Sequence, residues 1–238
     1  VPIFSKLLES CIKQQLSGYF TENSLFCNEQ FGFIPGRNTV KAVEKLVEQV
    51  IFNFENKLIS SATLIDLTKA FDCISHNLLV KKLFAYGIQN KELDLLASYL
   101  NNRKQMVVQG QEKSSFKGVN AGVPQGSVLG PFLFIISMND IAFNLPCPSV
   151  LYADDTTLLS WNKSLDTLLE DETQAIETAL EWFEANNLVV NSNKTEKIIF
   201  PLTHYIYKDV NPVKLLGLHL DSRLSWDQHI QELCKKII

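Results

Sequence analysis

Apolar residues recur at helical spacing in six stretches of the chain. Leu7, Cys11 and Ile12, for example, share one face of a helix, as do Val43, Leu46 and Val50. Ser75 precedes the third stretch and is typical of a residue that caps a helix. The pattern predicts helices over residues 3–20, 40–51, 75–85, 90–100, 131–141 and 165–187.

Short apolar runs bounded by turn residues predict strands. These runs cover residues 60–66, 106–108, 116–119, 149–152, 156–159, 188–190, 197–200 and 213–220, the last broken by Gly217. Residues 153–155 form the turn of a hairpin. The order of helices and strands favours an α+β fold, an antiparallel sheet backed by helices in a split βαβ arrangement, over a parallel doubly wound sheet.

Composition indicates a folded protein. The chain has 238 residues, of which 46% are hydrophobic and 20% charged, so it can bury a core as one large domain or two closely associated subdomains. Its five cysteines are odd in number and include no C-x-x-C pair, which fits a reducing compartment. No apolar run approaches the roughly 18 residues of a membrane span. We therefore expect a soluble, unsecreted protein without a membrane partner.

The net charge of −4 argues at first against a nucleic-acid partner, since binding phosphates requires an excess of Lys and Arg. Residues 165–187, however, hold seven acids and no base, which leaves 19 of the 26 acids against 22 basic residues elsewhere. The acidic run is interpreted as the solvated face of a helix. The rest of the chain is mildly basic, so a nucleic-acid partner remains compatible with the charge.

Three acids stand next to apolar strands. Asp66 ends the strand at 60–66, and Asp154 and Asp155 lie at the tip of the predicted hairpin. Carboxylates in apolar surroundings are costly unless a cation compensates them, and hard oxygen ligands suit Mg²⁺. Two such ions can serve in-line phosphoryl transfer. A lone Asp-Asp pair is usually just a turn, so spacing alone does not identify a site.

The sequence around these acids resembles that of the reverse transcriptases of LINE-type (non-LTR) retrotransposons, including the jockey-like group. Residues 152–155 (YADD) match the box that carries the family's paired acids, and residues 66–72 (DLTKAFD) resemble its first catalytic block. The other similar blocks are QFGF at 30–33 with GR at 36–37, GVPQGSVLGP at 122–131, Asn191 with KT at 194–195, and LLG at 215–217. Six blocks in family order cover nearly the whole chain, which excludes chance.

The resemblance implies the right-hand fold of polymerases. In that family, residues 1–59 would be partial helical fingers, and residues 60–212 the palm, with fingers elements around 75–120. Residues 213–238 would be the primer-grip strand and the start of a thumb. The chain thus resembles a core truncated at both ends, for which we expect intact metal geometry and poor processivity.

The resemblance also implies catalytic roles. Asp66 and Asp154 would bind two Mg²⁺ ions, with Mn²⁺ as a substitute, while Asp155 would assist and the Leu67 carbonyl would be a further ligand. Lys194 would protonate the pyrophosphate leaving group. Its alternative interpretation is an ordinary surface lysine.

Substrate contacts follow from the same blocks. Phe71 would exclude a ribose 2′-OH and so select deoxynucleotides, unless it is a core residue. The nucleotide site would comprise Ala70, Phe71, Gln125 and Gly126, and the template and primer would contact Arg37, Gly122, Pro124, Tyr152, Leu216 and Gly217. For Arg37 the alternative is an exposed side chain, and for Gly217 a plain β-bulge.

The activity implied is that of an RNA-directed DNA polymerase in retrotransposon copying. Its partners would be template RNA, a DNA primer or target DNA, and deoxynucleoside triphosphates, within a ribonucleoprotein of the nucleus and cytoplasm. One alternative is a viral RNA-dependent RNA polymerase, since Asp66 and Asp72 also fit its first block, although Phe71 argues against it. Another is an inactive or domesticated relic that binds nucleic acid or protein.

Overall fold

A computed structural model describes residues 3–202 and 212–237. The chain divides into two compact units. The first unit comprises residues up to 27, 68–140 and 183–189, and the second comprises residues 28–67, 141–182 and those from 190 onwards. The predicted boundary at residue 212 adjoins residues 203–211, which lie outside the described part of the chain.

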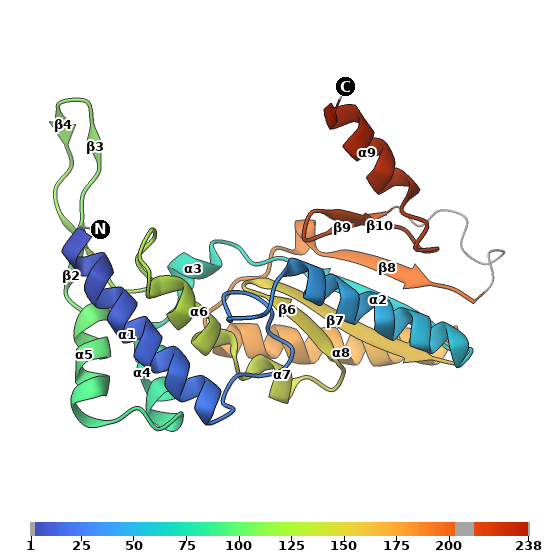
Figure 1. Ribbon diagram of the computed structural model, residues 1–238, viewed down its shortest axis with the longest axis horizontal. Coiled ribbons are helices and arrows are strands. Elements are labelled where there is room, and N and C mark those ends of the chain that lie inside the picture. The colour runs from blue at the N-terminus through green and yellow to red at the C-terminus, as the bar shows by residue number, and fades with distance from the viewer. Residues whose placement is uncertain (1–2, 203–211, 238) are drawn as a thin grey trace. The chain divides into compact units, whose positions relative to one another are not determined.

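The second unit is built on a four-stranded antiparallel sheet (Figure 1). Its strands, in spatial order, are β6 (Ser149–Tyr152), β7 (Asp155–Asn162), β1 (Ile59–Ile65) and β8 (Glu196–Phe200). The central strand β1 is almost fully buried, as its apolar sequence predicts. The prediction of an α+β fold with an antiparallel sheet is confirmed.

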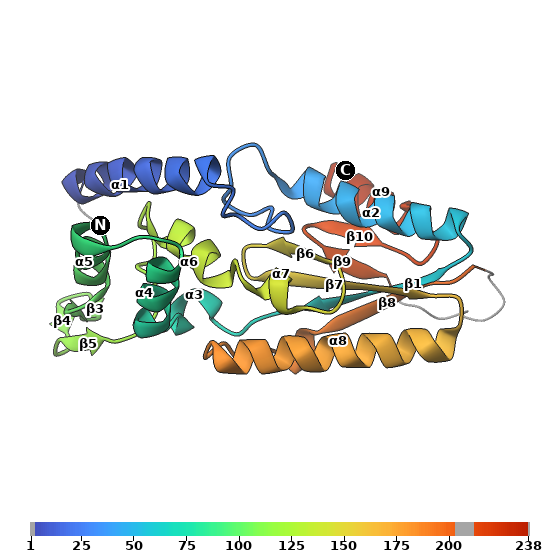
Figure 2. The ribbon, with the colours of Figure 1, turned by 90° about the horizontal axis from the view of Figure 1, so that it is seen from below.

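One face of this sheet is covered by α2 (Thr39–Glu55), which Figure 2 shows along the opposite side from α8. Helix α2 begins where the Asn38 side chain accepts the backbone N–H of Lys41, at 2.9 Å. Its apolar stripe packs into a core with the sheet and with the hairpin of β9 (Val213–Leu215) and β10 (Leu218–Leu220). Buried members of that core include Val43, Leu46, Val50, Ala62, Ile198, Phe200 and Val213.

The other face is covered by α8 (Leu165–Ala185), the predicted acidic helix. Leu168, Ala175 and Ala179 are buried. Glu172 is buried too, where it accepts a hydrogen bond from the Thr63 hydroxyl at 2.8 Å and pairs with the Lys197 ammonium. The interpretation of this acidic run as solvated is therefore wrong at Glu172, because Glu172 lies on the helix face that packs against the sheet.

The first unit is mainly helical. Its helices are α1 (Ile3–Glu22), α3 (Ala70–Cys73), α4 (His76–Ala85), α5 (Asn90–Leu100) and α6 (Gly130–Met138). The Ser75 hydroxyl caps α4 as predicted, accepting the backbone N–H of Leu78. Aromatic side chains join several of these elements, because the ring of Phe20 lies 5.1–6.0 Å from those of Phe26, Tyr86 and Phe132.

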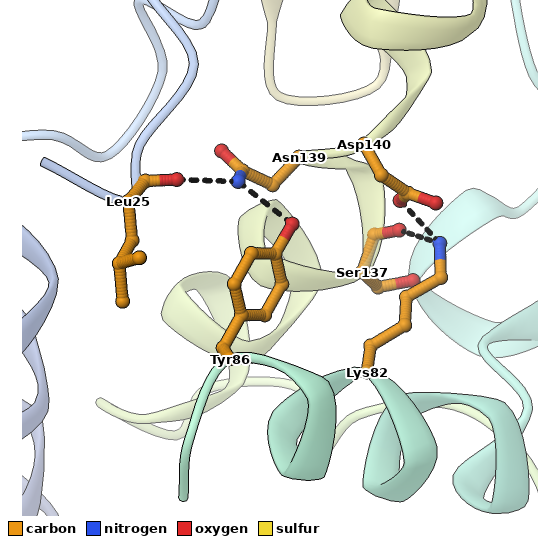
Figure 3. A network of polar contacts seen from close by, with 6 residues as sticks. All are labelled: Leu25, Lys82, Tyr86, Ser137, Asn139 and Asp140. Carbon is orange, nitrogen blue, oxygen red and sulfur yellow. Dashed lines mark hydrogen bonds and ion pairs between the residues drawn. The ribbon is translucent and has the colours of Figure 1, made fainter.

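Polar contacts at the end of α6 explain why the predicted apolar helix over 131–141 is split. The Asn139 amide donates to the Leu25 carbonyl and to the Tyr86 hydroxyl, both at 2.8 Å (Figure 3). Its oxygen accepts the Cys27 N–H at 2.9 Å. Beside it, the Lys82 ammonium donates to the Ser137 carbonyl and to the Asp140 carboxylate. The chain turns there and resumes as α7 (Ile141–Asn144).

Three strand predictions need correction. Residues 103–119 form two short pairs, β2 (Arg103–Gln105) with β5 (Lys117–Val119) and β3 (Val108–Gln109) with β4 (Glu112–Lys113). Residues 188–190 make a single bridge, Val190 to Leu67, rather than a strand. Residues 213–220 are a hairpin instead of one broken strand, because Leu216 and Gly217 both have positive φ and reverse the chain between β9 and β10.

Across residues 3–202 and 212–237, no helix combines the length and the apolar character needed to cross a bilayer.

Candidate functional site

The strand register of the second unit brings two predicted catalytic residues to Asp66. The pairing of β1 with β7 ends at Ile65 and Thr156, and one further step sets Asp66 opposite Asp155. The pairing of β1 with β8 ends at Leu64 and Glu196, and two further steps set Asp66 opposite Lys194. Accordingly, the Lys194 ammonium lies 3.6 Å from an Asp66 carboxylate oxygen. Lys194 itself belongs to the short 3₁₀ turn Ser192–Lys194 and is largely exposed.

These three side chains line one open cavity of about 420 Å³ in the second unit. The hairpin β9–β10 contributes Leu216 to the same cavity. Both lysine and carboxylate side chains line this cavity. The lining comprises Leu64, Ile65, Asp66, Asp155, Thr156, Thr157, Asn193, Lys194, Glu196, Lys214, Leu215 and Leu216. Such a mixed wall can bind an anionic substrate and a cation together.

The hairpin between β6 and β7 carries the paired acids. Tyr152 and Asp155 form its last strand pair, so the turn consists of Ala153 and Asp154. Ala153 has a φ of +56°, which is unusual for a residue other than glycine. Tyr152 is half-buried and packs against the core formed by α2, the sheet and the β9–β10 hairpin.

Burial and neighbouring negative charges raise the pKa of both acids of this hairpin. Burial raises the pKa of Asp154, and the Asp66 charge adds to this, while a backbone hydrogen bond opposes it. Burial, followed by the charges of Asp154 and Asp66, raises the pKa of Asp155 to about 6. A bound cation would offset these effects by stabilising the ionised forms of Asp154 and Asp155.

This donor set fits Mg²⁺ in its chemistry, because all three side chains offer hard oxygen ligands. Among the residues that the structure describes, no three Asp, Glu, His or Cys side chains are already gathered as ligands of one ion. Leu67, the predicted carbonyl ligand, is buried next to Asp66 and bridges to Val190.

The predicted nucleotide-binding residues belong to the first unit. Phe71, in α3, stacks on Phe134 with ring centroids 4.1 Å apart and an angle of 17° between the rings. The Phe71 carbonyl accepts the N–H of Val123 at 2.9 Å, which ties α3 to the loop at 122–130. Ala70 is buried beneath it.

Glycine is required where that loop passes α3. A Cβ atom on Gly122 would lie 2.8 Å from the Cα and the carbonyl oxygen of Asp72, and Gly122 has a φ of +82°. The Asp72 carboxylate accepts the Gln125 amide at 2.8 Å, so Asp72 holds the side chain of the predicted nucleotide contact. Gly126 follows with a φ of +73°, in the exposed part of the loop.

Two side chains anchor this loop: Ser127, within the block at 122–131, and Glu9, which the sequence analysis did not identify. The buried Glu9 carboxylate accepts the N–H groups of Val128 and Leu129, at 2.7 and 3.1 Å. The Ser127 hydroxyl donates to the Pro124 carbonyl and accepts the N–H of Gly130. Both contacts act at the start of α6, where an acid satisfies N–H groups that the helix leaves unpaired.

Two further residues predicted to contact the template or primer, Arg37 and Gly217, have structural roles in the second unit. Arg37, proposed for the template, is half-buried and donates to the Gln30 carbonyl at 2.6 Å. Gly217 lies in the turn between β9 and β10, which corrects its alternative interpretation as a β-bulge. The predicted site residues thus divide between the two units, with Asp66, Asp155, Lys194 and Leu216 lining one cavity.

Comparison with known proteins identifies the family. Residues 1–220 match the family model described as reverse transcriptase (RNA-dependent DNA polymerase). The chain is 32% identical over 262 residues to the probable RNA-directed DNA polymerase from transposon BS of Drosophila melanogaster, covering 98% of this chain and 28% of that protein. It is 28% identical to the RNA-directed DNA polymerase from mobile element jockey of the same species, covering 98% of this chain and 27% of the relative. The chain therefore spans little more than a quarter of these relatives.

Solved structures share the fold. Telomerase from Candida albicans, in complex with a TWJ fragment of telomeric RNA, aligns with a TM-score of 0.66 at 14% identity, over 93% of this chain and 38% of that one. Apo telomerase from Candida tropicalis, truncated from its C-terminal domain, aligns with a TM-score of 0.63 at 14% identity, over 94% and 45%. The predicted right-hand polymerase fold and the predicted resemblance are confirmed: the chain belongs to the reverse transcriptase family, RNA-dependent DNA polymerases of the kind found in non-LTR retrotransposons.

Proposed function

We propose that this chain carries the polymerising centre of a retrotransposon reverse transcriptase, which extends a DNA primer with deoxynucleotides on an RNA template. The observation that carries the proposal is the convergence of Asp66, Asp155 and Lys194 on one cavity through the register of three adjacent strands. Membership of the family supports the reaction class.

The carboxylates of Asp66, Asp154 and Asp155 would hold Mg²⁺, which supplies charge neutralisation for phosphoryl transfer when bound. Lys194, which lies 3.6 Å from Asp66, would donate a proton or a hydrogen bond to the departing pyrophosphate. Leu216, which lines the same cavity, would contact the primer. Phe71 and Gln125 would contact the incoming nucleotide, with the Gln125 amide held by Asp72.

The experiment is primer extension on an RNA template with deoxynucleotides and Mg²⁺. We expect Asp66→Asn and Asp154→Asn to lower the rate by at least about 100-fold, because each removes charge that the transition state requires. Asp94→Asn, which alters an exposed acid of α5, serves as the matched control and should extend normally.

Two results would overturn the proposal. Preferential use of ribonucleotides would indicate an RNA-dependent RNA polymerase. Retained binding of RNA and DNA with no extension, in wild-type protein as in Asp66→Asn, would indicate a binding module derived from a polymerase. We further propose that the chain works within a ribonucleoprotein that enters the nucleus, which fractionation of cells expressing it can test.

A further inference from the structure

Gln30, in the loop before α2, has a buried side-chain amide that is hydrogen-bonded to the hairpin between β6 and β7. Its side chain is fully buried. The side-chain oxygen accepts two backbone N–H groups, from Gly32 at 2.7 Å and from Ala153 at 2.9 Å. Its nitrogen faces the Ala153 carbonyl at 3.4 Å. One side chain therefore contacts both polar groups of the residue that precedes Asp154.

The backbone around Gln30 is attached to the same strand. The Phe31 N–H donates to the Leu151 carbonyl at 2.8 Å, and the Leu151 N–H donates to the Glu29 carbonyl at 2.9 Å. These bonds form a parallel bridge between Gln30 and Leu151. The Arg37 guanidinium then donates to the Gln30 carbonyl. Gln30 is thus fixed from two sides before its side chain reaches the turn.

Ala153 needs such support because its backbone is in the left-handed region, with a φ of +56°. For an L-residue with a Cβ atom this conformation costs roughly 1–2 kcal/mol. The loop also packs tightly there, since a Cβ atom on Gly32 would lie 2.4 Å from the Ala153 nitrogen. Without Gln30, a buried N–H would lose its acceptor and the turn could relax to a less strained conformation.

We infer that Gln30 is a positioning residue of the polymerising centre, which holds the Ala153–Asp154 turn so that the paired acids face Asp66. The inference rests on the proposed function for its catalytic consequence. Its structural consequence is independent of activity, because the orientation of the turn sets the ligand geometry whether or not chemistry follows.

The test compares Gln30→Met, which keeps the side-chain length and removes both polar atoms, with Asn53→Leu. Asn53 is also a buried amide of the second unit, but it bonds to Ser60, on β1. Three quantities are measured for each variant: amide hydrogen exchange at Ala153 by NMR, Mg²⁺ affinity by calorimetry, and the kcat and KM of primer extension.

For Gln30→Met we expect faster exchange at Ala153, Mg²⁺ affinity lowered about tenfold, and kcat lowered about 10- to 100-fold with KM unchanged. Asn53→Leu should lower the melting temperature without these changes. If Gln30→Met does not fold, Gln30→Asn keeps the amide on a side chain one carbon shorter and should show the same changes more weakly.

Equal exchange at Ala153 and equal Mg²⁺ affinity in the wild type and in Gln30→Met would overturn the inference. So would a loss of kcat that Asn53→Leu reproduces at equal stability. A wild-type chain that binds Mg²⁺ but never extends a primer would instead count against the proposed function, since the exchange and affinity measurements would still decide the role of Gln30.

Discussion

Phe71 and Phe134 stack face to face, with 4.1 Å between ring centroids and 17° between ring planes. Phe134, in the middle of α6, is fully buried, whereas Phe71 is only half-buried. A ring with one buried partner and one accessible side can be rigid and still contact a substrate. The stack therefore reconciles the two sequence interpretations of Phe71, because a residue anchored in the core can also exclude a ribose hydroxyl.

Replacing Phe71 by Val should weaken selection against ribonucleotides. The smaller side chain opens space where a 2′-OH would otherwise meet the ring, and such changes in a pocket typically alter discrimination by about 10- to 200-fold. The measurement is the ratio of kcat/KM for a deoxynucleotide and its ribonucleotide in primer extension. Phe71→Tyr, which keeps the ring, is the control, and an unchanged ratio in Phe71→Val would show that another group selects the sugar.

Phe134 offers a second test of the same contact. Phe134→Leu removes the stacking partner but leaves Phe71 in place, so the ring can shift. We expect a loss of discrimination in the same direction as in Phe71→Val but smaller, together with lower stability from the altered core. Lower stability with unchanged discrimination would mean that the stack supports the fold alone.

Glu9 should stabilise the fold, because it anchors the loop before α6. Its buried carboxylate accepts the N–H groups of Val128 and Leu129, and hydrogen bonds to a charged group contribute about 1.5–3 kcal/mol. Glu9→Ala is expected to lower the free energy of unfolding by about this amount in urea denaturation. Glu9→Gln should lose less, since an amide oxygen can still accept. Glu22→Ala, at an exposed acid of the same helix, should have almost no effect.

Much of this architecture could be predicted because its determinants are local. The helices follow from apolar spacing and, for α4, from the cap Ser75. The carboxylate after β1 follows from one apolar run that ends in an acid. The hairpin with the paired acids follows from two apolar strands around a polar turn. Each signal lies within about ten residues of the feature that it predicts.

The contacts that hold the site in place could not be predicted, because their partners are distant in sequence. Gln30 is 123 residues from Ala153, and Glu9 is 119 residues from Val128. A lone Gln or Glu in a turn or on a helix usually faces solvent. Only the register of the folded chain shows that these two are buried against backbone N–H groups.

The pair of Glu172 and Lys197 provides a prediction about the sheet. Glu172 is buried against β1 and β8, so Lys197→Met would leave its carboxylate with the Thr63 hydroxyl as the remaining partner among the described residues. We expect Lys197→Met to lower the free energy of unfolding by about 1–3 kcal/mol, because Glu172 is buried and loses its charged partner while Lys197 itself is exposed to solvent. The double variant Glu172→Met/Lys197→Met should recover most of that loss. Equal stability of Lys197→Met and the wild type would mean that solvent already compensates Glu172.

The ionised Asp155 carboxylate should destabilise the metal-free protein at neutral pH. Its pKa is raised to about 6 in the folded chain, above the 3.8 of an ordinary Asp, chiefly by burial and then by the charges of Asp154 and Asp66. Between these two values the folded state binds more protons than the unfolded state, so the free energy of unfolding falls as the pH rises from about 4 to 6.

Asp155→Asn removes this loss of stability, because the amide does not ionise. In EDTA at pH 7.5 we expect its melting temperature to exceed that of the wild type by about 2–4 °C, corresponding to roughly 1 kcal/mol after screening by solvent. The difference should vanish below about pH 4, where Asp155 is protonated in both states. Added Mg²⁺ should reverse the order by stabilising the wild type more than Asp155→Asn, since the variant has lost a charged ligand. A variant no more stable than the wild type in EDTA would show that neither burial nor the neighbouring charges raise the pKa of Asp155 in solution.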